Sequence, residues 1–257
     1  DRMNLGTLGG GNHFIELQED ENGMCCIMLH SGSRHFGNMI GQYFNKIAAN
    51  LNAKWHSSVD PSWNLHFLPV DTDEGARYIH WMQLAMDFAY ENRSIMLTKV
   101  KEIFTRYILK YTGIEPNYSN EINCHHNYAA LENHYDKNVW VHRKGAIRAA
   151  EGQLAIIPGA MGSFSYIVRG KGNPESFMSS SHGAGRVYSR TAAVATFPVD
   201  KVMCDLKEQN VVLAKYNKSD VAEESRFAYK DIDDVMANQT DLVEPVKKLF
   251  TVGVVKG

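Results

Sequence analysis

No uninterrupted apolar run in the sequence approaches the roughly 20 residues that a membrane-spanning helix requires. Hydrophobic residues make up 44% and charged residues 22% of the 257 positions, as in ordinary globular proteins. The opening stretch DRMNLGTLGG also lacks the basic and apolar regions of an export signal. These absences disfavour a membrane or disordered protein, so we expect a cytoplasmic protein with no membrane partner.

Cysteine is scarce, and net charge is nearly absent. None of the four cysteines (Cys25, Cys26, Cys124 and Cys204) has C-x-x-C spacing, and a bridge between the adjacent pair would be strained. We therefore expect reduced thiols rather than a disulfide framework. The formal net charge is −2, so the protein as a whole does not attract polyanions, and any nucleic-acid contact must be local.

The hydrophobic patterns alternate between strand and helix periods and predict a chain that contains both strands and helices. A loop or small insertion is expected from about residue 55 to residue 73, and residues 121–190 are rich in Gly, Ser and His. The final helix that we expect would carry Pro245 in its first turn and be followed by the strand-like TVGVV. We predict strands at 13–17, 25–31, 138–142, 154–157 and 165–168, and helices at 36–51, 74–109, 231–237 and 241–250.

Four histidine positions stand beside small residues: His13, His30, the pair His125-His126, and His182. A single histidine on a strand is more often a hydrogen-bonded core residue than a ligand. Four with Gly, Ser or Asn neighbours favour a site, because small neighbours leave room for a metal or a phosphate. Imidazoles suit Mn²⁺ and Zn²⁺. No H-x-x-x-H pair occurs, so distant strands would have to assemble the site.

Three glycine-rich segments could bind anions or could simply be tight turns. The first, GTLGGGN, leads into a strand and has no G-K-S/T, which excludes a P-loop. The others, IPGAMGSFS and SHGAGR, combine Gly with Ser. Arg186 and Arg190 favour phosphate at these turns, since a guanidinium can bind two phosphate oxygens. Additional charge that could form a local RNA or nucleotide surface comes from Arg143, Lys144, Arg169 and Lys171.

A series of motifs closely resembles, in order, those of the RtcB-type RNA-splicing ligases. The motifs are GTLGGGNHFIEL, LHSGSRHFG, EINCHHNYA, VHRKGAIRA, IPGAMGSFSYIVRG, ESFMSSSHGAGRVYSR, FAYKDIDDVM and a terminal VVKG. The resemblance implies an RtcB-like α+β fold in which mixed β-sheets carry the site and long amphipathic helices brace them. It also implies a GTP-dependent enzyme with two Mn²⁺ ions. Such enzymes join RNA 3′-phosphate or 2′,3′-cyclic phosphate ends to 5′-hydroxyl ends, in tRNA splicing and RNA repair.

The resemblance further implies roles for individual residues. His182 is similar to the nucleophile that takes GMP through a phosphoramidate bond, for which a neutral imidazole is suited. His13, His30 and His126 match the metal-binding histidines. The residues that resemble nucleotide contacts, with the last two on the guanine side, are Asn12, Glu16, Pro158, Gly159, Ala160, Met161, Ser165, Gly183, Ala184, Gly185, Tyr229 and Lys256.

Two departures from the family pattern matter. Ala160 stands where the family usually has Ser, and one lost hydrogen bond to GTP would cost about 0.5–1.5 kcal/mol. An upstream Asp and a Cys that bind metal in the family precede the first residue of this chain, and none of the four cysteines matches that motif. We therefore expect residues 1–257 to be the C-terminal portion of a single catalytic domain, with an incomplete metal site.

Two other functions fit the same residues. A metal-dependent phosphohydrolase or nuclease could use the histidine cluster without a nucleotidyl intermediate, although a guanine-side pair such as Tyr229 and Lys256 would then have no purpose. An inactive fragment that binds RNA or a partner subunit is the third interpretation. The sequence does not identify the RNA (tRNA halves or broken ends), the preferred divalent ion or any accessory protein.

Overall fold

The computed structural model describes residues 2–257, which divide into two compact units. The first unit comprises the N-terminal residues as far as Thr7 together with Ser31–Tyr107, and the second comprises Leu8–His30 and Ile108–Gly257. The first is helical, and the second is built mainly from antiparallel strands. This combination confirms the α+β class.

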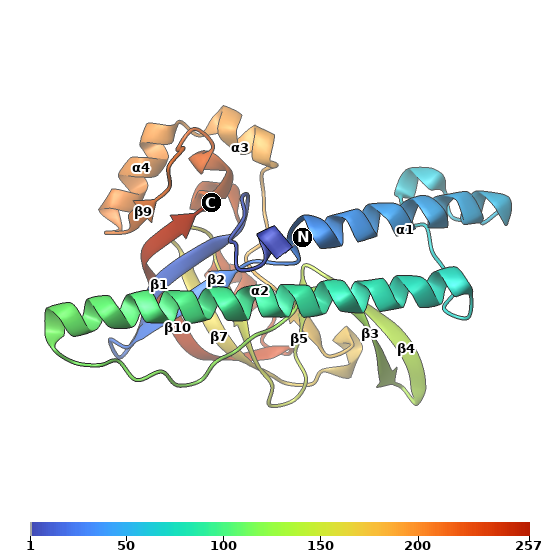
Figure 1. The fold of residues 1–257 in the computed structure, drawn as a ribbon, viewed down its shortest axis with the longest axis horizontal. Coiled ribbons are helices and arrows are strands. Elements are labelled where there is room, and N and C mark those ends of the chain that lie inside the picture. The colour runs from blue at the N-terminus through green and yellow to red at the C-terminus, as the bar shows by residue number, and fades with distance from the viewer. Residues whose placement is uncertain (1) are drawn as a thin grey trace. The chain divides into compact units, whose positions relative to one another are not determined.

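The helical unit contains α1 (Arg34–Lys54), the short η1 (Arg2–Asn4) and η2 (Pro61–Trp63), and most of α2 (Asp73–Thr112), the two long helices in Figure 1. Both α-helices were predicted. The segment between them is irregular, as expected. Asn52 holds it to α1, because its amide donates to the Phe67 carbonyl (2.7 Å) and accepts from the Phe67 N–H (3.2 Å).

A buried asparagine organises the N-terminal residues of the helical unit. Asn92 on α2 is fully buried, and its Oδ1 accepts from the backbone N–H groups of Gly6 (2.7 Å) and Thr7 (3.1 Å). Its Nδ2 donates to the Thr7 carbonyl, the Ser31 hydroxyl and the Gly32 carbonyl. One side chain thereby satisfies polar groups from two separate segments, Gly6–Thr7 and Ser31–Gly32, which would otherwise be buried without partners.

The second unit is centred on a six-stranded sheet in the order β2-β1-β10-β7-β6, with β9 also paired to β10. All pairs are antiparallel except β9 with β10, so the sheet is mixed, as expected. Every strand predicted for this sheet is present. The strands are β1 (Phe14–Asp20), β2 (Cys25–His30), β6 (Leu154–Ile157), β7 (Phe164–Gly170), β9 (Val212–Ala214) and β10 (Val243–Lys256).

The C-terminal strand β10 corrects one prediction. We expected a helix at 241–250, but residues 243–256 form a strand between β1 and β7. Pro245 lies where the register with β7 shifts, and proline, which has no N–H to donate, is tolerated at such irregularities. Buried residues such as Val243, Leu249 and Val254 then face the core of the unit.

Two small sheets complete the second unit: β3 pairs with β4 in a hairpin, and β5 pairs with β8. The helices α3 and α4, orange in Figure 1, lie near β9 and the C-terminus. No helix within residues 2–257 is long and apolar enough to cross a membrane. The remaining elements are β3 (Asn127–His134), β4 (Lys137–Lys144), β5 (Ala146–Arg148), η3 (Pro174–Ser176), β8 (Ser179–Ser181), α3 (Arg190–Thr196), α4 (Val199–Glu208), η4 (Val221–Glu224), η5 (Arg226–Ala228) and α5 (Ile232–Ala237).

Replacement of the buried asparagine should destabilise the protein. We expect Asn92→Ala to lower the free energy of unfolding by about 2–4 kcal/mol, because it leaves buried backbone groups without partners. The control is Gln83→Ala, which removes an exposed hydrogen bond to Asp87 on the same helix and should change stability by less than about 0.5 kcal/mol. Equal denaturant midpoints for the two variants would contradict this role of Asn92.

Candidate active site

Four imidazoles from four chain segments converge in the second unit. His13 immediately precedes β1, His30 ends β2, His126 immediately precedes β3, and His182 immediately follows β8. The ring centroids are 5.6 Å apart for His13 and His30, 4.8 Å for His30 and His126, and 5.2 Å for His126 and His182. The fold therefore brings together the four histidines that the sequence singled out, and their role as a site stays a prediction.

Two of these imidazoles have a separation that suits a shared metal ion. The Nε2 atoms of His30 and His126 lie 3.3 Å apart. Two nitrogens bound tetrahedrally to one ion, each at 2.0–2.1 Å, would be separated by about 3.3 Å. Within residues 2–257, however, no three His, Cys, Asp or Glu side chains are arranged to hold a metal by themselves. The two histidines thus fit as partial ligands, and further donors are required.

Burial favours the neutral form of two of these imidazoles, His30 and His182, by lowering their pKa values. Burial lowers the pKa of His30 well below its usual value, and the neighbouring His126, His13 and His182 lower it further. A positive charge on one imidazole would be desolvated and would repel its neighbours. The neutral form that results is the form that binds metals or attacks phosphorus.

His182 is oriented by the glycine that precedes β5. Gly145 has a positive φ of +66°, and a Cβ there would lie 3.2 Å from Cε1 and 3.4 Å from Nδ1 of His182. Burial lowers the pKa of His182, and a hydrogen bond with the Gly145 backbone offsets part of that effect. Because Nδ1 faces Gly145, Nε2 is the nitrogen available to an electrophile.

The two glycine-rich turns expected to cradle a nucleotide contact each other. The Ala184 N–H donates to the Pro158 carbonyl (3.2 Å), and a Cβ on Gly183 would lie 3.0 Å from the same carbonyl oxygen. In the Pro158 turn, the Gly159 N–H donates to the Ser165 hydroxyl (3.2 Å). Ala160 is buried at this turn. The residues predicted at both turns are therefore neighbours in space.

A buried carboxylate lies beside this turn. Glu16 is 4% exposed and accepts hydrogen bonds from Gln18 Nε2 (2.7 Å) and Thr251 Oγ1 (3.3 Å). Gln18 also donates to Ser165 Oγ (3.1 Å), and its own Oε1 has no hydrogen-bond partner among residues 2–257. Burial raises the pKa of Glu16 to about 7, although its hydrogen bonds and the charge of Lys256 oppose this. This group can therefore gain or lose a proton near neutrality.

A row of side chains across the sheet connects the histidine cluster with Lys256. Phe14 on β1 is opposite His30 on β2 and opposite Lys256 on β10. Its ring makes an edge contact with His30 (5.5 Å), and Lys256 Nζ lies 6.0 Å from its centroid on the other side. The apolar ring thus separates the imidazoles from a buried ammonium group.

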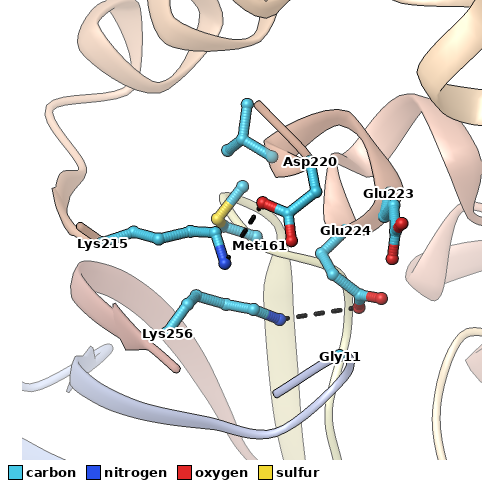
Figure 2. Close-up of a pocket in the computed structure, with 8 residues that line it drawn as sticks. Gly11, Met161, Lys215, Asp220, Glu223, Glu224 and Lys256 are labelled. Atoms are coloured by element: carbon cyan, nitrogen blue, oxygen red, sulfur yellow. Dashed lines mark ion pairs between the residues drawn. The ribbon is translucent and has the colours of Figure 1, made fainter. Parts of the chain in front are cut away.

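Lys256 lines a charged pocket, shown in Figure 2. Lys256 Nζ is 3.6 Å from Glu224, and Lys215 Nζ is 3.3 Å from Asp220, with both ammonium groups directed toward the carboxylates. Burial lowers the pKa of Lys256, and the carboxylates of Glu224 and Glu16 oppose this. The pocket is also lined by Gly11, Met161, Val221 and Glu223.

Tyr229 lies beside this pocket, and a hydrogen bond to Glu224 holds its hydroxyl group. Its hydroxyl donates to Glu224 Oε2 (2.6 Å) and accepts from Arg186 Nη1 (2.9 Å). Burial and the adjacent carboxylate raise the pKa of Tyr229. The backbone carbonyl of Gly185 accepts from the Lys230 N–H (2.9 Å), which joins the His182 loop to the Tyr229 segment. Predicted site residues from the centre and the end of the chain thus meet here.

Sequence reasoning missed several residues and misjudged one. Phe14, Lys215, Asp220 and Glu224 were not singled out, since no local motif distinguishes them from ordinary strand or loop residues. Asn12 lies half-buried in the turn before β1. Arg143 was expected to add surface charge, but it is only 2% exposed and bonded to Glu132. This part of the predicted RNA surface is wrong.

The raised pKa of Glu16 predicts a pH-dependent stability. Its folded pKa of about 7 lies above the usual 4.5, so folding favours the protonated form. The contribution is present below about pH 4.5 and is lost as pH rises toward 7, by at most about 3 kcal/mol. Between pH 4.5 and 7.5, the free energy of unfolding should therefore decrease less for Glu16→Gln than for the wild-type protein. Parallel curves for the two proteins in urea titrations would contradict the assignment.

Comparison with known proteins agrees with the motifs. Residues 1–257 match the family described as tRNA-splicing ligase RtcB. An RNA-splicing ligase RtcB of Escherichia coli (strain K12) is 45% identical over 98% of this chain and 61% of its own length. A tRNA-splicing ligase RtcB of Pyrobaculum aerophilum is 32% identical over 100% of this chain and 60% of its own length.

A third relative, the tRNA-splicing ligase RtcB of Methanococcus maripaludis, is 32% identical over 98% of this chain and 60% of its own length. The chain therefore spans about three fifths of the length of these curated relatives. Bacterial and archaeal relatives share the name, and the match covers the whole chain. The chain belongs to the RtcB tRNA-splicing ligase family.

Proposed function

We propose that this chain carries the nucleotidyl-transfer centre of a GTP-dependent RNA ligase that joins 3′-phosphate or 2′,3′-cyclic phosphate ends to 5′-hydroxyl ends. The observation that supports this most directly is the stacking of His182 on His126, with ring planes 6° apart, beside two other imidazoles. We further propose that residues 1–257 form the C-terminal portion of one RtcB-like catalytic domain. The family to which the chain belongs supports both statements.

The nucleophile in this proposal is His182. Its Nε2 lone pair attacks the α-phosphorus of GTP, a P–N bond forms, and the bond to the β-phosphate oxygen breaks with release of pyrophosphate. The burial that keeps the ring neutral makes the lone pair available. The Gly145 backbone lies against the Cε1 and Nδ1 edge of the ring, which leaves Nε2 as the nitrogen that attacks in this proposal.

Transfer to RNA would follow in two steps. An RNA 3′-phosphate oxygen attacks the phosphorus held by His182, and the P–N bond breaks to restore the neutral ring. The 5′-hydroxyl of the second RNA end then attacks the activated 3′-phosphate, and GMP leaves. A cyclic phosphate end is first opened by water. The partners implied are tRNA halves or broken RNA ends in the cytoplasm.

His30 and His126, with His13 close by, are the residues that would hold divalent ions such as Mn²⁺, two per complete site. When bound, these ions would neutralise charge on the phosphates and on the leaving pyrophosphate. The 3.3 Å separation of the two Nε2 atoms fits this role. Because no three-residue metal site exists within residues 2–257, the remaining ligands are assigned to water, to phosphate or to other parts of the enzyme.

The charged pocket would bind the guanine base. Guanine presents a keto acceptor beside N–H donors, which an ammonium group and a carboxylate complement, as Lys256 and Glu224 are placed to do. Phe14 lies between His30 and Lys256 in the sheet, and two strand spacings amount to about 10 Å. A nucleotide whose base lies at Lys256 and whose α-phosphate lies at the histidines would span such a distance.

Labelling with GTP tests the function. Incubation with α-labelled GTP and Mn²⁺ should yield a covalent GMP adduct that acid releases, because a phosphoramidate is acid-labile. His182→Ala should form no adduct. His142→Ala, which alters an exposed histidine on β4, should be labelled like wild type.

Two results would count against the ligase. If the intact wild-type protein is not labelled with any divalent metal ion tested, the proposed transfer of GMP to His182 is wrong. Metal-dependent cleavage of RNA or phosphate esters without an adduct would favour a phosphohydrolase or nuclease. Calorimetry adds an independent measurement, since a guanine pocket should bind GTP more tightly than ATP.

A further inference from the structure

Arg143, at the end of the β3–β4 hairpin, is the centre of a buried hydrogen-bond network. Its guanidinium donates to both carboxylate oxygens of Glu132 (2.6 and 3.0 Å) and to the Tyr128 hydroxyl (3.3 Å), all on β3. It also donates to the Ser179 hydroxyl (2.9 Å) at the start of β8 and to the carbonyl of Phe177 (2.9 Å), two residues before that strand. One side chain therefore makes five hydrogen bonds, three to β3 and two to the segment that leads into β8.

The two segments that Arg143 joins are those that carry His126 and His182. His126 immediately precedes β3, two residues before Tyr128. His182 immediately follows β8, three residues after Ser179. Because β3 pairs with β4 while β8 pairs with β5, the two histidines are held by different small sheets. The relative placement of their stacked rings depends on what connects these sheets.

The network is electrostatically matched. Burial alone would raise the pKa of Glu132, but hydrogen bonds from Arg143 and His134 outweigh burial and lower it to about 2. The carboxylate is therefore charged across the physiological range and remains paired with the guanidinium. A planar fork with five donors is required for these five bonds, and a lysine ammonium has only three donors in a different geometry.

We propose that Arg143 is a positioning residue that holds β8 against β3 and thereby aligns His182 with His126 for nucleotidyl transfer. This inference rests on the proposed function of His182. This role replaces the predicted contribution of Arg143 to an RNA or nucleotide surface. A displacement of about 1 Å in a reacting group is enough to reduce a rate about 100-fold.

The test measures the rate of GMP-adduct formation in the intact protein and compares variants of two arginines that both lie near Glu132. Arg143→Lys should slow GMP transfer to His182 about 100-fold while GTP affinity stays unchanged. Millimolar guanidinium, far below the molar concentrations that unfold proteins, should restore part of the rate to Arg143→Ala. The control is Arg148→Lys, because Arg148 is half exposed and lies 3.7 Å from the same Glu132. It should retain the wild-type rate.

A second measurement does not depend on activity. The ¹⁵N resonances of His182 and His126 in histidine-labelled protein should shift in Arg143→Lys and remain in place in Arg148→Lys. If the Arg143 variants do not fold, Ser179→Ala should still slow adduct formation about tenfold, because it removes the hydroxyl that accepts from Arg143 and donates to the Phe177 carbonyl.

The outcomes separate the two proposals. A wild-type rate together with unshifted His182 resonances in Arg143→Lys would overturn the positioning role, as would a wild-type rate in Ser179→Ala. Absence of any adduct in the wild-type protein would overturn the nucleotidyl function instead. In that case the resonances of His182 and His126 in the variants still decide whether Arg143 aligns the two rings.

Discussion

Four imidazoles can share one small volume only while they are uncharged. Desolvation and mutual repulsion both lower the pKa of His30, and burial lowers that of His182. A proton on any one ring would repel a proton on the next, so at most a small part of the cluster can carry charge at one time. The same condition leaves nitrogen lone pairs available at a place from which water is largely excluded. The chemistry of the site therefore follows from packing rather than from one unusual residue.

The register of the sheet separates two parts of the candidate site, the histidine cluster and the charged pocket at Lys256. His30, Phe14 and Lys256 are neighbours in one row across β2, β1 and β10. The aromatic ring keeps the buried ammonium away from the imidazoles, on the side where Glu224 can pair with it. A positive charge close to the rings would favour neutral imidazoles still further, but it would also repel any cation that they bind. Separation by Phe14 allows both features to exist in one unit.

The histidine cluster and both long helices could be predicted, because each rests on a local signal. Small residues beside each histidine and the apolar period of residues 36–51 and 74–109 are visible in the sequence. The strand at Val243–Lys256 was mistaken for a helix, since Pro245 suits a first helical turn as well as a bulge. The sequence did not single out Glu224 and Lys215, because they reach the pocket only when segments distant in sequence pack together in the fold. Burial of Arg143 depends on tertiary packing that no local pattern encodes.

A buried arginine with a charged partner is weak evidence for stability, because desolvation of two ions offsets much of their attraction. Two well-packed apolar side chains could fill the space of Arg143 and Glu132 at similar stability. They could not supply hydrogen bonds to Ser179, to the Phe177 carbonyl and to Tyr128 at defined angles. What the ion pair adds is therefore geometric. It fixes the position of β8 relative to β3. Because His182 immediately follows β8, it thereby also fixes the position of the His182 imidazole.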